Sequence, residues 1–129
     1  MNKKVYEIDG DIFSTLEEFC DEFNRKMNLE ITWNGNLDAL NDILNGGFGT
    51  PDDGFVLAWK NSAQSRKRLG YGETIRQIEK RLQGCHPSNA PYFKKKLDNA
   101  KRNVGPTVFD WLVEIISGEG HEDIELRLE

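Results

Sequence analysis

The chain has 129 residues, of which 37 % are apolar and 30 % are charged, and its formal net charge is −5 at pH 7. These values favour one folded domain over residues 1–129 and argue against a disordered chain. No run approaches the roughly 18 apolar residues of a membrane span, and no apolar signal core follows the N-terminal Met-Asn-Lys-Lys. We therefore expect a cytoplasmic protein with reduced thiols, since two cysteines are too few for a disulfide framework.

The charges are unevenly distributed along the chain. Residues 60–105 hold 12 Lys and Arg against 3 Asp and Glu, whereas the remainder holds 5 against 19. An acidic body argues against nucleic acid as the main ligand and favours a basic protein partner.

The first elements are a short strand and an amphipathic helix. Lys4 to Ile8 is a strand candidate that turn residues Asp9 and Gly10 close. Ser14 or Thr15 then caps a helix, with a Glu three residues further on as in a capping box. The apolar residues of this helix recur every three or four positions, which predicts a buried face made of Leu16, Phe19, Cys20, Phe23 and Met27.

A second helix follows Asn36, whose side-chain oxygen can accept one of the free N–H groups of the first turn. Its apolar residues predict a buried stripe made of Leu37, Leu40, Ile43 and Leu44. Gly46 and Gly47 end the helix, because glycine adopts the left-handed conformation of a helix end at little steric cost.

The other face of this second helix carries Asp38, Asn41, Asp42 and Asn45. The two Asp side chains lie about one turn apart, as like charges on one side, and the helix contains no Lys or Arg to neutralise them. Two interpretations remain open at this point. The face is either an ordinary solvated surface or the binding site of a cationic partner.

The rest of the chain completes an alternation of strands and helices. Phe55 to Trp59 is a continuous apolar run, typical of a buried strand of a parallel sheet. A polar helix is expected from Ser62, an apolar one over Pro106–Ser117, and a last strand over Ile124–Leu128. This order predicts an α/β fold with a small three-stranded parallel sheet flanked by helices.

Residues 70–104 form a basic helical insertion in this scheme. Two short helices are expected over Thr74–Leu82 and Tyr92–Ala100, on either side of a Gly84–Pro91 loop. The segment is either a second contact surface, for an acidic patch or RNA, or a solubilising insertion that complements the acidic body.

Residues 35–40, Gly-Asn-Leu-Asp-Ala-Leu, followed by Asp42 and a glycine-containing helix end, resemble the signature of the barstar family of intracellular ribonuclease inhibitors. The resemblance covers roughly residues 4–69 and 105–128 and leaves out the segment between them. It implies a barstar-like domain with an added insertion over residues 70–104, and it implies a protein inhibitor rather than an enzyme, without a cofactor or a metal.

The resemblance also implies a binding site for a basic ribonuclease or ribonuclease-like toxin. Asp42 matches the deepest acidic contact of the family, and Asp38 would pair with a neighbouring cation. Glu114 maps to a further acidic contact from the last helix. Trp33 is either an aromatic platform or a core anchor. The expected partner-binding residues are Trp33, Asn34, Gly35, Asn36, Asp38, Asn41, Asp42, Asn45, Gly46, Gly47, Phe48 and Glu114.

Other function classes have less support in the sequence. An enzyme using Asp38 and Asp42 as a pair lacks a third ligand or nucleophile and a phosphate-binding loop. Cys85-His86 has no second Cys or His at metal-ligand spacing, which indicates a loop. The alternative function is a nucleic-acid-binding module that uses the basic residues 66–102, with Lys94–Lys96 beside Tyr71, Tyr92 and Phe93.

Overall fold

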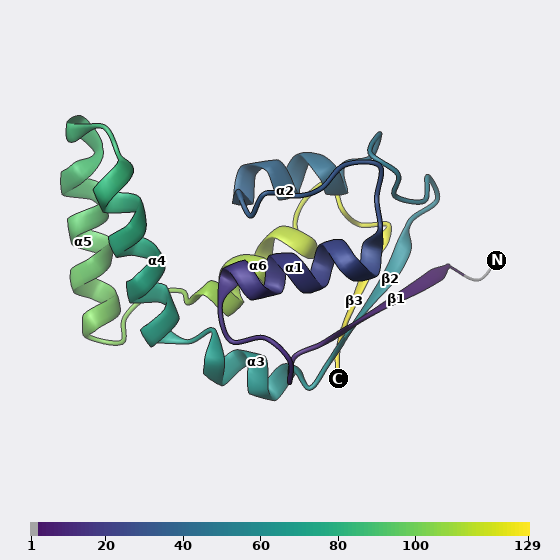
Figure 1. Ribbon diagram of the computed structural model, residues 1–129, viewed down its shortest axis with the longest axis horizontal. Coiled ribbons are helices and arrows are strands. Elements are labelled where there is room, and N and C mark those ends of the chain that lie inside the picture. The colour runs from purple at the N-terminus through teal and green to yellow at the C-terminus, as the bar shows by residue number, and fades with distance from the viewer. Residues whose placement is uncertain (1–2) are drawn as a thin grey trace.

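The computed structural model describes residues 3–129 and alternates strands with helices (Figure 1). Its elements, in chain order, are β1 (Lys4–Asp9), α1 (Leu16–Met27), α2 (Leu37–Leu44), β2 (Phe55–Lys60), α3 (Ser62–Arg68), α4 (Tyr71–Gly84), a 3-10 turn (Pro87–Asn89), α5 (Ala90–Lys101), α6 (Val108–Ile116) and β3 (Ile124–Leu128). No helix within residues 3–129 is both long and apolar enough to cross a membrane.

The three strands form one parallel sheet in the order β1-β2-β3. Leu57 of β2 lies opposite Tyr6 on one side and Leu126 on the other. Residues 55–59 are all buried, because β2 is the central strand and has a neighbour at both edges. The predicted α/β class, the three strands and their parallel direction are therefore confirmed.

One face of the sheet supplies the strand side of the core. Its buried residues pack with the apolar stripes of the helices in one cluster, and the strand members are Tyr6, Ile8, Phe55, Leu57, Trp59 and Ile124. On the other face Val5 is 48 % exposed and Glu7 is also exposed. The alternation between these faces is the period of two that a strand imposes on its side chains.

Local hydrogen bonds explain where the helices begin. Thr15 caps α1 by accepting from the Glu18 N–H. Of the two residues predicted as the cap, Ser14 and Thr15, the structure therefore uses Thr15. Thr107 caps α6 and exchanges side-chain to backbone hydrogen bonds with Asp110 in a capping box. The helix therefore begins at Val108, and Pro106 lies before the cap rather than in the first turn as expected, because the Thr107 side chain provides the stronger start signal.

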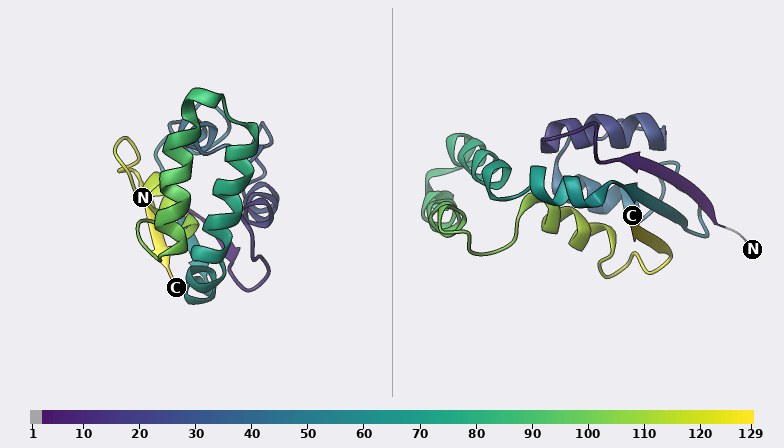
Figure 2. Two further views of the ribbon diagram at one scale, coloured as in Figure 1. Left: turned by 90° about the vertical axis from the view of Figure 1, so that its left-hand side faces the viewer. Right: turned by 90° about the horizontal axis from the view of Figure 1, so that it is seen from below.

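The two helices expected in residues 70–104 are present and longer than predicted. α4 and α5 pack against each other as an antiparallel hairpin, residues 71–101, which stands beside the helices of the body and away from the strands (Figures 1 and 2). Two adjacent residues of α4 join it to the body. Glu73 accepts from the Leu16 N–H at 2.7 Å, and Thr74 accepts from the Val108 N–H at 2.9 Å. α4 thus satisfies the first free N–H of both α1 and α6.

Candidate partner-binding site

The loop before α2 is held by its own side chains. The Asn36 side chain accepts from the Ala39 N–H at 3.0 Å and caps the helix as predicted. Asn34 in turn accepts from the Asn36 N–H at 3.0 Å. Gly35 between them has a φ of 89°, a conformation that L-residues rarely adopt. The loop therefore presents a defined backbone at the start of the helix.

Asp38 and Asp42 both project from α2 into solvent. Each is exposed, and so is Asn41 between them. Within residues 3–129 neither Asp forms a salt bridge with a Lys, Arg or His side chain. The buried stripe of the same helix consists of Leu40, Ile43 and Leu44. α2 thus displays two carboxylates that the fold neither buries nor pairs.

Trp33 lies in the core and is only 2 % exposed. Its indole N–H donates to the Asn36 carbonyl at 2.7 Å, and its ring packs edge-on against Phe19 and Phe23. Of the two interpretations left open, the core anchor is therefore the one that the structure adopts. Trp33 therefore offers a partner no exposed aromatic platform, and its buried indole instead supports the loop before α2.

Cys20 supports the same loop from α1. Its thiol is buried and donates to the Trp33 carbonyl at 3.1 Å. Burial raises the pKa of this thiol, which keeps the donor proton in place. The expectation that Cys20 is a small core residue is confirmed.

The C-terminal end of α2 is fixed by a contact with a distant loop. Asn45 ends the helix, and its side-chain oxygen lies 3.0 Å from Nε2 of the buried His121. Gly46 and Gly47 follow with φ values of 110° and 91°, as expected for glycines at a helix end. Phe48 is half-buried against the core, so its ring is only partly available to a partner.

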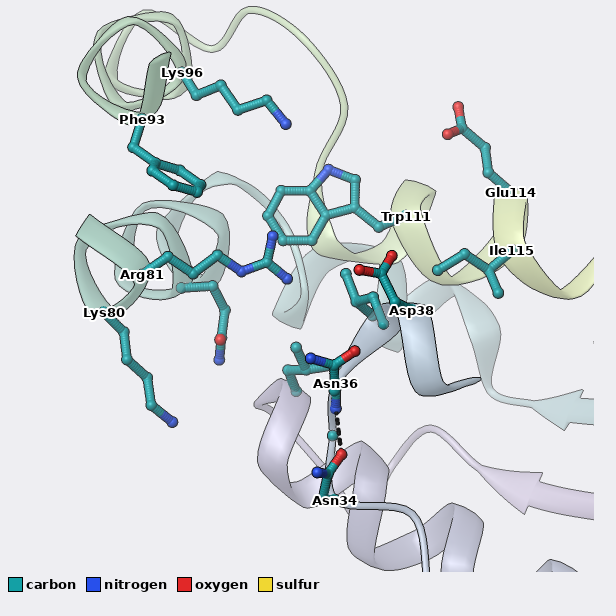
Figure 3. A pocket seen from close by; sticks show the side chains of 14 residues that line it. Asn34, Asn36, Asp38, Lys80, Arg81, Phe93, Lys96, Trp111, Glu114 and Ile115 are labelled. Carbon is teal, nitrogen blue, oxygen red and sulfur yellow. Dashed lines mark hydrogen bonds between the residues drawn. The ribbon is translucent and has the colours of Figure 1, made fainter. Parts of the chain in front are cut away.

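The N-terminal end of α2 forms one side of a cleft of about 730 Å³ (Figure 3). Asn34, Gly35, Asn36 and Asp38 line it, together with the exposed Glu114 of α6. The structure thus brings five of the predicted site residues to one cleft. The other predicted residues do not line this cleft. Trp33 lies in the core before α2, while Asn41, Asp42 and Asn45 lie further along α2 or at its C-cap, and Gly46, Gly47 and Phe48 follow the helix.

The opposite side of the cleft comes from the hairpin and from α6, and sequence reasoning did not assign these residues to the site of α2. Arg81 of α4, Lys96 and Phe93 of α5, and the half-buried Trp111 of α6 line it. The Arg81 guanidinium lies 5.1 Å from the Trp111 ring centre, and the Lys96 ammonium lies 6.0 Å from it. The basic composition of residues 66–102 indicated that this segment could be a contact surface. It did not indicate that the segment lies opposite α2.

Other residues singled out in the sequence have local roles. The Tyr71 hydroxyl donates to the Gly105 carbonyl at 2.7 Å and closes the base of the hairpin. Lys94 and Lys95 are exposed and do not line the cleft. His86 caps the 3-10 turn by accepting from the Ser88 N–H. Within residues 3–129, no group of three or more His, Cys, Asp and Glu is arranged to hold a metal ion.

The family of the chain follows from a comparison of its sequence with family models. The model described as Barstar (barnase inhibitor) matches residues 3–88, about two thirds of the chain. No curated protein matches the sequence of this chain. The family match includes α4, which we had placed outside the short family form, and it does not reach residues 105–128, where the resemblance remains a prediction. With two parallel strands, β1 and β2, and the exposed acidic helix in the matched part, the chain belongs to the barstar family.

Proposed function

We propose that this protein inhibits a ribonuclease or ribonuclease-like toxin by inserting α2 into the active site of that enzyme. The family is that of a barnase inhibitor, which supports ribonuclease inhibition as the general role. The observation that carries the mechanism is that Asp38 and Asp42 are exposed on one helix without an ion pair within residues 3–129.

The chemical basis is the replacement of a phosphate by a carboxylate. An enzyme that cleaves RNA holds a phosphodiester with Arg, Lys and His side chains. Asp42 would accept charge-assisted hydrogen bonds from these groups, bidentate where an Arg donates. Asp38, one turn earlier, would pair with an adjacent cation and help to set the register. The polar residues Asn41 and Asn45 would fill the space between these contacts and the helix end.

The rigid loop before α2 supports this mechanism. The positive φ of Gly35 and the cap formed by Asn36 fix the backbone before the partner arrives, so less conformational freedom is lost on binding. Glu114 and the other exposed acids would attract a basic enzyme from a distance. Association should therefore be fast at low salt and slower as ionic strength rises.

We infer that the protein acts as an antidote in the cytoplasm and has no catalytic activity of its own. Its partner is a basic nuclease, either made by the same cell or delivered from outside. Such a role requires only a surface complementary to an active site.

Inhibition of barnase by the purified protein tests this proposal directly. The wild-type chain should inhibit RNA cleavage, and Asp42→Asn should weaken inhibition by roughly a hundredfold, the equivalent of about 3 kcal/mol for hydrogen bonds to a charged group. Asp38→Asn should weaken it less. Glu7→Gln provides a matched control, because it removes one exposed carboxylate from β1 on the other face of the sheet.

Two outcomes would contradict the proposed inhibition. Full inhibition by the double variant Asp38→Asn/Asp42→Asn would exclude α2 as the inhibitory element. A wild-type chain that inhibits neither barnase nor any other basic ribonuclease would exclude the role itself.

A further inference from the structure

Two cations of the hairpin converge on one aromatic side chain at the cleft. Arg81 and Lys96 come from different helices and approach the Trp111 ring to 5.1 and 6.0 Å. Within residues 3–129 neither of them forms a salt bridge, although the neighbouring Lys80 pairs with Glu17. Two like charges beside one aromatic ring, neither of them in an ion pair, favour the binding of an anion between them.

A hydrogen-bond donor lies at the same place. The indole N–H groups of Trp33 and Trp59 donate to the Asn36 carbonyl and the Ser65 hydroxyl. Within residues 3–129 no hydrogen bond joins the Trp111 indole N–H to an acceptor, and no buried side-chain N or O atom lacks a partner, so this N–H is open to solvent. The indole nitrogen is turned toward the Lys96 ammonium (Figure 3). An anion here would meet one neutral and two charged donors.

The side chains at the base of the hairpin hold these donors in a fixed position. The buried Glu73 carboxylate accepts from the Leu16 N–H, from Gln77 and from Arg76. Arg76 also pairs with Glu17 of α1. Because these five groups from two elements meet at this point, α4 is fixed to α1 and the cleft has a rigid wall.

The carboxylates that also line the cleft determine which kind of anionic partner can bind to Arg81 and Lys96. Asp38 and Glu114 line the same cleft, and Asp38 and Arg81 point into it from facing sides (Figure 3). A nucleic acid carries a negative charge at every phosphate and would be repelled by these carboxylates. A protein segment that has an acidic side chain next to basic ones complements both sides.

We propose that the hairpin is a second contact wall for the protein partner, and that the cleft binds a partner segment whose carboxylate reaches Arg81, Lys96 and the Trp111 indole N–H. This inference rests on the proposed function and adds a property of the partner. The ribonuclease carries an acidic side chain beside its basic active site. The hairpin would then select among ribonucleases that α2 alone accepts.

A peptide titration tests the cleft separately from ribonuclease inhibition. The probe is the capped peptide Lys-Gly-Glu-Gly-Lys, added to the full-length ¹⁵N-labelled protein, and the readout is the indole N–H signal of Trp111. Trp111→Phe assigns this signal, and the Trp33 and Trp59 signals provide internal references. The Glu peptide should shift the Trp111 signal saturably in the millimolar range. The same peptide with Gln in place of Glu should bind at least tenfold more weakly.

Two double variants remove the same amount of charge from different places. Arg81→Gln/Lys96→Gln removes both cations of the cleft and should weaken Glu-peptide binding at least tenfold. Lys94→Gln/Lys95→Gln removes two exposed cations of α5 that do not line the cleft. The second pair should leave binding within twofold of the wild type.

Three results would overturn the inference. The first is equal binding of the Glu and Gln peptides, the second is no shift of the Trp111 signal with either peptide, and the third is tighter binding of hexauridylate than of the Glu peptide. The third result would assign the cleft to nucleic acid. None of them changes the barnase assay, in which Asp42→Asn tests α2 alone, so failures of the two proposals are distinguishable.

Discussion

The two sides of the cleft carry opposite charge and are built in different ways. α2 has eight residues, and the carboxylates that it displays are exposed along a helix fixed by a cap at Asn36 and by His121 at its other end. The hairpin is held by paired charges at its base, where Glu73 and Glu17 meet Arg76. Toward the cleft, Lys80 also pairs with Glu17, but within residues 3–129 Arg81 and Lys96 form no salt bridge.

Charges at the base of the hairpin hold the fold together, whereas those at the cleft and on α2 are available to a partner. At the base of the hairpin the carboxylate of Glu73 is buried and fully hydrogen-bonded, which is the condition under which a buried charge is tolerated. Asp38, Asp42, Arg81 and Lys96 form no salt bridge within residues 3–129. The lack of an ion pair, rather than the number of charges, marks the candidate contact residues.

The largest effect is expected from reversing one charge on α2. Asp42→Lys would place a cation against the cations of a ribonuclease site, and like charges at an interface cost several kcal/mol. Inhibition of barnase should fall by about a thousandfold or more. Thermal unfolding should stay at the wild-type temperature or rise slightly, because a like-charge pair on the helix is removed. A variant that still inhibits would show that α2 does not enter the site.

A smaller effect is expected on stability from the base of the hairpin. Glu73→Gln keeps the shape of the side chain but removes a buried charge that accepts from Leu16, Arg76 and Gln77. The free energy of unfolding, measured in urea, should fall by about 1–3 kcal/mol. Glu79→Gln on the exposed side of α4 is the matched control and should change it by less than about 0.5 kcal/mol. Equal losses in both variants would contradict the assignment of Glu73 as the anchor.

The cations of the cleft should contribute about a factor of ten to inhibition. Arg81→Gln/Lys96→Gln should raise the inhibition constant for a ribonuclease with an acidic side chain beside its active site by roughly tenfold, or about 1.4 kcal/mol. The alternative role for Arg81 is that of an internal counter-ion for Asp38. That role predicts the opposite sign, because removing the competing cation would then tighten inhibition.

The smallest effect concerns pH. Burial alone raises the pKa of Glu17, but hydrogen bonds from Gln77, Arg76 and Lys80 outweigh it and lower the pKa from 4.5 to about 2. As pH falls, Glu17 therefore takes up its proton at a higher pH in the unfolded chain than in the folded protein. The stabilisation is complete above about pH 4.5 and is lost as pH falls toward about 2. Because Glu17 is partly exposed, we expect less than about 1 kcal/mol.

Urea unfolding of the wild type and of Glu17→Gln at pH 6 and at pH 3 measures this contribution. The difference in stability between the two proteins should be larger at the higher pH. A constant difference would show that the carboxylate makes no net contribution.

Local sequence patterns were sufficient to predict the sheet and the acidic helix. The uninterrupted apolar run of residues 55–59 indicated a central strand, and Asn36 indicated the start of α2, because both signals lie within a few residues of the element that they define. Trp33 was ambiguous for the opposite reason. Its burial depends on Phe19 and Phe23 of α1, which no pattern near residue 33 reveals.

The second wall of the cleft depends on contacts between distant residues. The hairpin was expected as two helices, but its place beside α2 is set by bonds from Glu73 to Leu16 and from Thr74 to Val108, which span 57 and 34 residues. Trp111 was not assigned to the site, because the other apolar residues of α6 already form a complete buried stripe at helical spacing. Helical periodicity predicts which residues face the core but does not predict which other segment faces them.

The two bonds made by neighbouring residues of α4 limit how this protein can be re-engineered. Glu73 and Thr74 complete the starts of two helices that are far apart in the chain. Excising residues 71–101 as a cassette would leave the Leu16 and Val108 amides without their acceptors in the interior, and transplanting the hairpin onto a shorter relative would supply caps that the recipient has no use for. We therefore expect the hairpin and the body to unfold together, and a chimera that exchanges the hairpin should also exchange the starts of α1 and α6.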